Sequence, residues 1–515
     1  MTGTMRAAFQ HAIEANRGRV AIEDETRTLA FEEVGAWASA VAAQLLALGV
    51  ERGDAVSLLT RNRAEFLVAD VAVALVGAIK SPINYMLPLD TVAYILSASR
   101  AKVVVVDRVL LPLAEAAVAT LAKPPVLIVV RDDGQLPEGA HWLADAASAP
   151  AALPPIDIAP EMPAALYFTG GTTGRPKGVL HTQASTVALH YAQLLEGEIA
   201  QDDRLLLMTP MAHAAGLFAQ SAFIRGATSV VTDGFEANRA VQLFVDSAIT
   251  WTFLVPTMIY RVIDVLTERD VELSLRTVVY GAAPISPTRL EQALDLFGPV
   301  FVQLYGQTEM PNWGTRLTKV DHDPARPQLL ASCGRASIMA DVKVVDPEGR
   351  TVADGETGEI CLRSPYVLSE YLGDADATKE KFLDDWIRTG DIGVMEEGYL
   401  YLRDRKNDMV ISGGMNVYSR EVEDALSRHP SVKAAAVIGV PHEDWGEAVH
   451  AVVVLDEGAD VAESELLQWS RAHLAAYARP KSIEFVDALP ETAFGKVDKK
   501  ALREPHWAGQ WRSIG

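Results

Sequence analysis

The chain has few cysteines, few basic residues and no long apolar run. Its 515 residues include two cysteines, Cys333 and Cys361, which are too few for a disulfide scaffold or a zinc site, so we expect both to be buried small apolar side chains. The longest apolar runs, such as 68–79, fall short of a membrane span. The N-terminal residues lack the unbroken apolar segment of a signal peptide and suit an amphipathic helix, which predicts a cytoplasmic protein.

The shortage of basic residues gives a formal net charge of −22. Such a charge argues against nonspecific nucleic-acid binding. It also makes a local group of basic residues beside a loop a stronger sign of an anion-binding site. With 49% apolar and 22% charged residues, the composition is that of an ordinary globular protein. The length suggests two to four domains or subdomains.

The order of apolar runs predicts the fold class. Runs such as VSLLT at Val56 and AKVVVVD at Ala101 alternate with helix-like stretches, which indicates an α/β fold with largely parallel, buried strands. An Ala/Pro-rich loop is expected at 145–160, a second α/β stretch at 203–306, and a β-rich subdomain at 328–398. After about residue 403, short helices and strands alternate. We therefore predict a large N-terminal domain, 1–402, and a small α+β C-terminal domain, 403–515.

The most informative stretch is LYFTGGTTGRPKGVLH, residues 166–181. An apolar strand end is followed by a loop with little side-chain bulk and many backbone N–H groups, which can form an anion-binding nest. Arg175 and Lys177 add positive charge, while Pro176 and Gly178 exclude the P-loop of nucleoside triphosphatases. The alternative is a flexible surface linker. The preceding strand and the two cations favour a phosphate-binding loop, whose candidate residues are Thr169, Gly170, Gly171, Thr172, Thr173, Gly174 and Lys177.

Six further segments carry polar residues that suit nucleotide chemistry: PMAHAAGLF at 210, VVYGAAPIS at 278, QLYGQTEM at 303, WIRTGDIG at 386, YLRDRKND at 401 and LPETAFGKVDKK at 489. Tyr305 could stack on a purine, Thr308 could bond a phosphate oxygen, and Glu309 could hold magnesium through its hard carboxylate oxygen. Each segment alone has a plainer explanation. A lone histidine such as His213 is usually a core residue, a Thr-Glu pair often caps a helix, and an Asp after Gly is often a turn residue.

Together and in this order, the segments resemble the signatures of the adenylate-forming superfamily, which includes acyl-CoA synthetases, coumarate-type ligases, firefly-type luciferases and peptide-synthetase adenylation domains. The resemblance covers most of the chain. It departs at Gly170, where serine is usual, at Asn407, where Asp or Lys is usual, and at Met415, where Glu is common.

The resemblance implies an acid–thiol ligase, in which a carboxylate and ATP give acyl-AMP and pyrophosphate, and coenzyme A then displaces AMP. The catalytic residues would be Lys496, His213, Thr308 and Glu309. Lys496 would be the catalytic lysine of the first step, and its neighbours Lys499 and Lys500 are expected to be dispensable. The small domain would be mobile and rotate about a hinge at Asn407. Gly281, Ala282, Ala283 and Pro284 would lie against adenine, Asp391 would bind the ribose, and Glu309 would hold Mg²⁺. The remaining nucleotide contacts would come from Tyr305, Gly306, Thr308 and Arg405.

The resemblance also suggests where the other two substrates bind. Trp445, Tyr477 and Arg479 match coenzyme A positions of some aryl-CoA ligases, although packing explains the two aromatic residues equally well. The acyl pocket would be lined by His213, Ala214, Phe253, Gly281, Gly306 and Met310. These residues suit a hydrophobic acid, with an aryl or arylpropenoic acid favoured slightly over a medium-chain fatty acid.

Rival interpretations stay open at this point. They are a stand-alone adenylation enzyme that loads a carrier protein, a luciferase-like oxygenase, and a non-catalytic nucleotide-binding protein. Joint retention of Lys496, Glu309, Asp391 and Arg405 counts against the last. The oligomeric state is also left open, a homodimer included.

Overall fold

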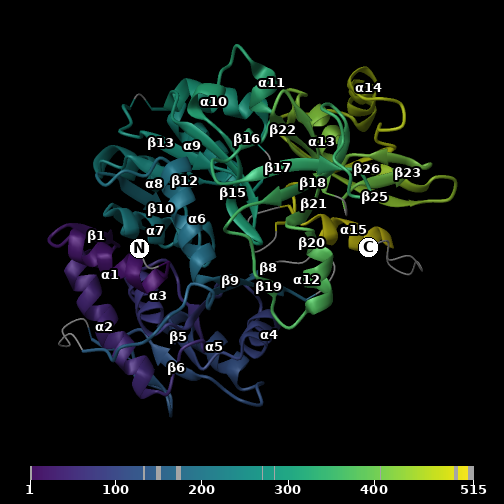
Figure 1. The fold of residues 1–515 in the computed structure, drawn as a ribbon. Helices are drawn as coiled ribbons and strands as arrows, with labels where there is room; N and C mark the ends of the chain where they lie inside the picture. The colour runs from purple at the N-terminus through teal and green to yellow at the C-terminus, as the bar shows by residue number, and fades with distance from the viewer. Residues whose placement is uncertain are drawn as a thin grey trace.

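The computed structural model describes residues 3–131, 134–145, 152–169, 175–269, 271–283, 285–405, 408–491 and 497–507. The predictions on residues 170–174, Pro284, Asn407 and Lys496 therefore lie outside the described residues. The described chain forms four sheets with helices between and around them (Figure 1).

Sheet 1 lies in the lower, blue part of Figure 1. In spatial order its strands are β19 (Glu370–Tyr371), β9 (Lys177–Thr182), β8 (Pro163–Thr169), β4 (Ile79–Pro82), β3 (Ala55–Leu59), β5 (Val103–Val106), β6 (Val126–Val129) and β7 (His141–Trp142). The strands from β8 to β7 are parallel, and β9 and β19 continue the sheet in antiparallel fashion. The helical segments between these strands are α3 (Ala64–Val76), α4 (Leu89–Ser99), η1 (Arg108–Leu110) and α5 (Leu111–Val118).

Sheet 2 lies above sheet 1 in Figure 1. Its strands in order are β16 (Arg335–Ala336), β15 (Met310–Leu317), β14 (Phe301–Gln307), β13 (Thr277–Tyr280), β12 (Trp251–Leu254), β10 (Arg204–Leu207), β11 (Thr228–Val231), β1 (Val20–Glu23) and β2 (Thr28–Ala30). The run from β14 to β1 is parallel. The associated helices are α1 (Met5–Ala15), α2 (Phe31–Ala47), α6 (Gln183–Glu196), α7 (Ala214–Arg225), α8 (Ala237–Asp246), α9 (Pro256–Leu266), α10 (Pro287–Phe297), η2 (Lys319–Asp321) and α11 (Pro327–Leu330).

Sheets 3 and 4 come from the last third of the chain. Sheet 3 contains β17 (Asp341–Val345), β18 (Thr357–Arg363), β21 (Trp386–Glu396) and β20 (Phe382–Leu383), with β22 (Tyr399–Arg405) also paired to β21, and α12 (Ala375–Lys381) lies between β19 and β20 in the chain. Sheet 4 contains β24 (Met415–Val417), β23 (Val410–Ser412), β26 (Gly446–Leu455) and β25 (Val432–His442), with β27 (Ser482–Phe485) paired to β26. Its helices are α13 (Ser419–Ser427), α14 (Glu463–His473) and α15 (Lys499–Trp507).

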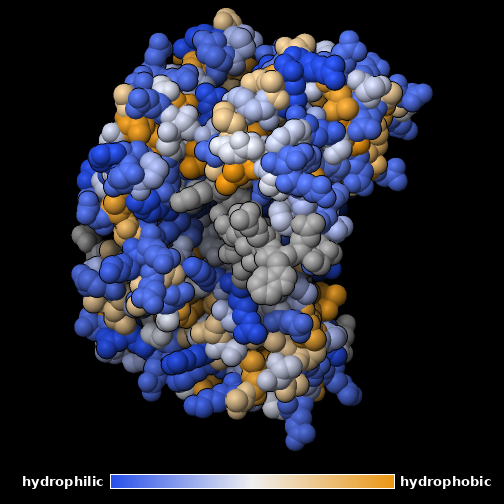
Figure 2. All heavy atoms as spheres, turned by 90° about the vertical axis from the view of Figure 1, so that its right-hand side faces the viewer, coloured by the Kyte–Doolittle hydropathy of each residue, from blue (hydrophilic) through white to orange (hydrophobic). Residues whose placement is uncertain are grey.

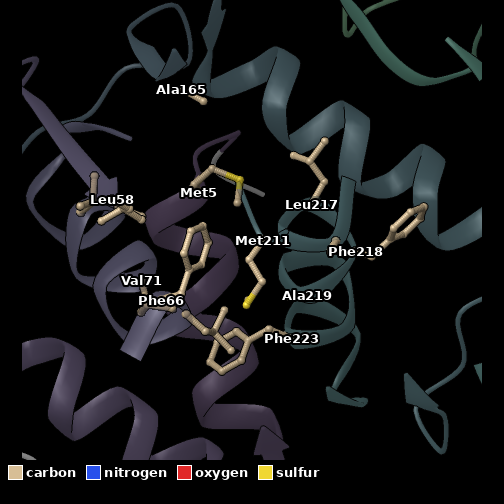
Figure 3. Packing of buried hydrophobic residues seen from close by; sticks show 14 of the residues in the cluster. Met5, Leu58, Phe66, Val71, Ala165, Met211, Leu217, Phe218, Ala219 and Phe223 are labelled. Atoms are coloured by element: carbon tan, nitrogen blue, oxygen red, sulfur yellow. The ribbon is translucent and has the colours of Figure 1, made fainter. Parts of the chain in front are cut away.

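The largest core cluster joins sheets 1 and 2. Every residue of α3 is buried, because this helix packs against α1, α2 and α7 and is apolar on nearly all sides. Figure 3 shows Phe66 of α3 beside Met5 of α1, Phe223 of α7, and Met211, which precedes α7. Truncating a buried aromatic such as Phe66 to alanine costs about 3–5 kcal/mol. This core fixes the relative positions of the two sheets whose strand ends carry the site described below.

The structure confirms the predicted mixed α/β fold, with parallel buried strands, a β-rich segment and a small α+β segment. Cys333 and Cys361 are both buried and free, as expected. None of the described helices has the length and hydropathy needed to cross a membrane, and the face in Figure 2 carries mostly hydrophilic side chains with small hydrophobic groups between them. The predicted boundary at 402/403 falls within β22, and the division into domains stays a prediction.

Candidate active site

The predicted nucleotide residues lie on, or directly after, strands from three sheets. In sheet 2 the neighbouring strands β13 and β14 are parallel, so the residues that follow them meet at one edge. In sheet 1, β8 ends at Thr169, directly before the glycine loop. In sheet 3, Asp391 lies on β21. The crevice beyond the carboxyl ends of parallel strands is the usual place for a ligand in α/β folds.

Asp391 is the centre of one polar group. Its Oδ2 accepts hydrogen bonds from the Tyr305 hydroxyl at 2.7 Å and from Gln307 Nε2 at 2.9 Å. Arg405 lies opposite Asp391 in the β21–β22 pairing, and its Nε is 3.7 Å from Oδ1. Burial, followed by the negative charge of Asp391, raises the pKa of Tyr305 well above its usual range, so its hydroxyl stays a donor. Asp391 thus lies within a strand and is not a turn residue.

Glu309 is the centre of a second group. Thr308 and Glu309 form the two-residue turn between β14 and β15, so the alternative that this pair caps a helix is wrong. The Glu309 Oε1 accepts a hydrogen bond from the Tyr371 hydroxyl at 2.5 Å and lies 3.6 Å from Lys381 Nζ. Lys381 also donates to Gln307 Oε1 at 3.1 Å, which joins this group to the Asp391 group.

The turn is also held from sheet 1. His181 Nε2 lies 2.9 Å from the Thr308 carbonyl oxygen. Burial lowers the pKa of His181 to about 4, so the ring is neutral at pH 7 and donates its N–H to this carbonyl. The Lys177 ammonium lies 5.0 Å from the centre of the Tyr371 ring, a cation–π contact that links the residues flanking the glycine loop to Glu309.

Gly281 and Gly306, both predicted to contact the nucleotide and the acyl group, lie where the fold leaves no room for a side chain. A Cβ on Gly281 would lie 2.4 Å from the Leu304 carbonyl oxygen, and one on Gly306 would lie 2.7 Å from the Asn312 amide nitrogen. Neighbouring backbone therefore forbids a side chain at both positions before any ligand binds. Ala282, next in the predicted adenine loop, is exposed and has a φ of 65°, and Ala283 is half-buried.

The predicted acyl-pocket residues come from adjacent elements. His213 and Ala214 begin α7 and are half-buried, Phe253 is buried on β12, and Met310 is fully buried at the start of β15. The Phe253 ring packs 5.3 Å from that of Phe218 on α7. Phe253 and Met310 belong to the same core cluster, and Ala214 packs against it.

The predicted coenzyme A residues lie in the C-terminal part. Trp445 is 39% exposed, stacks on His442 with a centroid distance of 4.2 Å, and has Lys481 Nζ 4.8 Å from its ring. Tyr477 is 42% exposed. Arg479 donates to the carbonyl oxygens of Leu474 and Arg471, each at 3.1 Å, and so it helps to end α14.

Lys499 and Lys500 are the first two residues of α15, but their surroundings differ. Lys499 Nζ donates to Ser419 Oγ at 2.6 Å and pairs with Glu423 at 2.7 Å. Removing Lys499 would leave Glu423 without this partner, so a loss of stability is expected, and the expectation that Lys499 is dispensable for activity stays a prediction. Lys500 is exposed and suits a control.

The Lys499 contacts tie the start of α15 to Ser419. Ser419 also donates its backbone N–H and its hydroxyl to the Asp404 carboxylate, and Asp404 precedes Arg405. Burial raises the pKa of Asp404 to about 6. Among the described residues nearby, Glu491 and Val497 form an isolated antiparallel bridge. The start of α15 is thus tied to the strand end that carries Arg405.

Sequence reasoning missed four residues of the site: His181, Gln307, Tyr371 and Lys381. His181 and Gln307 lie inside motifs already singled out, so a buried-strand histidine and a polar residue at a strand end were visible signals. Tyr371 and Lys381 lie 62 and 72 positions after Glu309 in the sequence, and no local pattern marks them.

Comparison with known proteins identifies the family of this chain. Residues 9–372 match the family of AMP-binding enzymes, and residues 421–496 match the C-terminal domain of AMP-binding enzymes. The chain belongs to this family, which confirms the resemblance drawn from the motifs.

Similar proteins narrow the reaction class. A medium/long-chain-fatty-acid–CoA ligase of Mycobacterium tuberculosis is 37% identical over 484 residues, which cover 91% of this chain and 84% of the relative. A feruloyl-CoA synthase of Amycolatopsis sp is 34% identical over 485 residues, covering 92% and 93%. The amide bond synthetase McbA of Marinactinospora thermotolerans has a similar structure, with a TM-score of 0.88, 30% identity and coverage of 97% and 99%. The prediction of an AMP-forming acid–thiol ligase is confirmed by the named CoA ligases.

Proposed function

We propose that this chain activates a hydrophobic carboxylic acid with ATP to give acyl-AMP and pyrophosphate, and then transfers the acyl group to coenzyme A. The observation that carries this proposal is the junction of two polar groups at the end of β14. Asp391, held by Tyr305 and Gln307, offers acceptors for the ribose hydroxyls, and Glu309 lies beside it through the shared contacts of Gln307 and Lys381.

The residues around Glu309 suit a magnesium nucleotide. A carboxylate is the kind of hard oxygen ligand that Mg²⁺ takes together with phosphate oxygens, and both described contacts of Glu309 fall on Oε1. Glu309 would hold the ion, which would neutralise charge on the phosphates. Lys177 and Lys381 lie on either side of Glu309 and Tyr371, so both cations would add to the same field.

Lys496 is proposed to act in the first step. A carboxylate that attacks the α-phosphate brings two anions together, and a preorganised cation lowers the energy of that encounter. The contacts of Lys499 with Ser419 and Glu423 support this role, because they hold the chain three residues later against the strand end that carries Arg405. The rotation about Asn407 that would follow is part of the proposal.

The acyl pocket supports a hydrophobic acid. His213, Ala214, Phe253, Gly281, Gly306 and Met310 include no lysine or arginine, so a second carboxylate on the substrate would have no cationic partner among them. The two relatives act on a fatty acid and on an arylpropenoic acid by their names, and either acid is hydrophobic, as the proposed lining residues are. We keep the preference for an aryl or arylpropenoic acid.

The experiment is an acid panel with ATP, Mg²⁺ and coenzyme A. Ferulate, cinnamate, octanoate and a dicarboxylate are compared, and AMP and thioester are both measured. One hydrophobic monoacid should give AMP and thioester in equal amounts, and the dicarboxylate should give little of either. AMP formation without thioester would reject coenzyme A as the acceptor, and thioester on an added phosphopantetheinylated carrier protein would then identify the alternative. The absence of AMP with every acid would reject the proposal.

A further inference from the structure

Sheet 4 carries a second cluster of chemically active side chains, away from the residues described above. His450 of β26, Glu484 of β27 and His506 of α15 each offer one ligand atom, and these atoms lie within 4.8 Å of one another. Two imidazoles and one carboxylate are a donor set that Zn²⁺ takes in proteins.

The fold brings these residues together by register. β26 and β27 are parallel, with His450 opposite Ser482 and Val452 opposite Glu484. Side chains alternate along a strand, so Ser482 and Glu484 lie on the same face of the sheet. α15 packs on the sheet, and Trp507, next to His506, donates its ring N–H to the Gly439 carbonyl oxygen of β25 at 3.0 Å.

His450 is oriented as a metal-binding histidine usually is. Its side chain is only 8% exposed, and its Nδ1 lies 2.7 Å from Ser482 Oγ. Its Nε2 is buried and has no hydrogen-bond partner within the described part of the chain. A histidine that ligates a metal through one nitrogen commonly has its other nitrogen held by a hydrogen bond, which fixes the ring.

The cluster has no sufficient explanation in hydrogen bonding. Glu484 Oε2 lies 3.6 Å from His450 Nε2, beyond hydrogen-bond distance, and the His450 and His506 rings approach to a centroid distance of 5.0 Å. Leaving a buried polar nitrogen without a partner costs free energy, so such a group calls for an explanation. A cation between the three side chains would provide the partner.

We propose that His450, Glu484 and His506 bind one divalent transition-metal ion of the zinc class. Imidazole nitrogen selects such ions over Mg²⁺ and Ca²⁺, which prefer oxygen ligands throughout. Ligand atoms around a tetrahedral zinc lie about 3.3 Å apart, given bonds of about 2.0–2.1 Å. Glu484 and His506 are exposed and can close the remaining distance by turning their side chains, while buried His450 stays fixed. Water would complete the coordination.

The ion would fasten the last turn of α15 to sheet 4. The first residue of this helix is already held by the Lys499–Glu423 pair, and Arg503 pairs with Asp408 at 2.6 Å. At the far end, His506 would add a metal-mediated attachment next to the Trp507–Gly439 hydrogen bond. α15 begins three residues after Lys496, so a bound metal would also restrain the helix that follows the proposed catalytic segment.

The test is zinc titration of the full-length, untagged chain after removal of metals with a chelator. Calorimetry should show one Zn²⁺ bound per chain at a site that excess Mg²⁺ does not block, and Co²⁺ should give the visible absorption of a four-coordinate ion. His506→Gln and Glu484→Gln should each weaken this binding at least tenfold, the range seen even for less direct changes at metal sites. Zn²⁺ should raise the melting temperature of the parent but not of His506→Gln.

His473→Gln is the matched control, because His473 is an exposed histidine of α14, the preceding helix in the chain. It should bind Zn²⁺ like the parent. The proposal is overturned if the parent takes up no stoichiometric Zn²⁺, or if His506→Gln and Glu484→Gln bind it as tightly as the parent does, which would place the ion elsewhere, such as at Glu309. These outcomes do not depend on ligase activity, so they are distinct from failure of the proposed function.

Discussion

Tyr305→Phe separates two roles of one residue, stacking on a purine and orientation of Asp391. The phenylalanine keeps the ring and removes only the hydroxyl, which donates to Asp391 Oδ2 at 2.7 Å. The carboxylate would retain the Gln307 Nε2 donor at 2.9 Å and the Arg405 guanidinium at 3.7 Å. It would therefore stay charged and close to its place, but it would be less firmly oriented.

The magnitude follows from the kind of bond that is lost. A hydrogen bond to a charged group contributes about 1.5–3 kcal/mol. At about 1.4 kcal/mol for each tenfold change, full expression of this loss in ATP binding would raise KM for ATP by roughly 10- to 150-fold. We expect the change in KM for the acid to be small, because the Asp391 group lies outside the predicted acyl pocket.

The assay is acid-dependent exchange of pyrophosphate into ATP, with KM measured for ATP and for the acid separately. Tyr399→Phe is the matched control, because the Tyr399 hydroxyl donates to Asp321 at 2.8 Å outside the site. Both variants should lose comparable thermal stability, but only Tyr305→Phe should raise KM for ATP. An unchanged KM for ATP, or an equal rise for both substrates, would refute the claim that Tyr305 orients a ribose-binding carboxylate.

Three further predictions follow from the site. Lys496→Ala should slow acyl-AMP formation by roughly 10²–10³-fold, while supplied acyl-AMP still reacts with coenzyme A. The control Lys500→Ala should resemble the parent. Equal slowing of both half-reactions by Lys496→Ala would contradict the two-state rotation. Arg479→Ala should retain pyrophosphate exchange but lose thioester formation, and loss of both together with a lower melting temperature would indicate that Arg479 serves only to end α14. His181→Gln should flatten the pH dependence of the free energy of unfolding, because burial lowers the pKa of His181 from 6.5 to about 4. The neutral ring's contribution to stability, up to about 3 kcal/mol, is complete above pH 6.5 and is lost as the pH falls through 4. If denaturant titrations show the same change of unfolding free energy with pH in variant and parent, this prediction is wrong.

The sequence predicted those parts of the fold that depend on local pattern. Valine-rich runs such as 103–106 are fully buried parallel strands. The motif at 303–310 was expected to follow a strand, but its first five residues lie within β14 and only Thr308 and Glu309 form the turn after it. The nature of the Thr308–Glu309 turn was not predictable, because the choice between a hairpin and a helix cap depends on whether residues 310–317 pair with β14.

The missed residues have a common physical reason. Tyr371 reaches Glu309 because β19 pairs with β9, and these strands are almost 190 positions apart in the chain. Arg405 reaches Asp391 through the β21–β22 register. Contacts of this kind depend on which strands pair, and a single sequence does not show that pairing. A motif indicates the chemistry of its own residues but not which distant residues will contact them.

The central claim is that the carboxylate attacks the α-phosphate of ATP. The most direct measurement uses an acid that the panel identifies as a substrate, labelled with ¹⁸O in both carboxylate oxygens, followed by mass spectrometry of the products. One ¹⁸O atom is expected in each AMP formed with coenzyme A present and none in pyrophosphate, because the acyl–oxygen bond breaks when the thiol displaces AMP. Label in pyrophosphate or orthophosphate, or AMP without label, would contradict it.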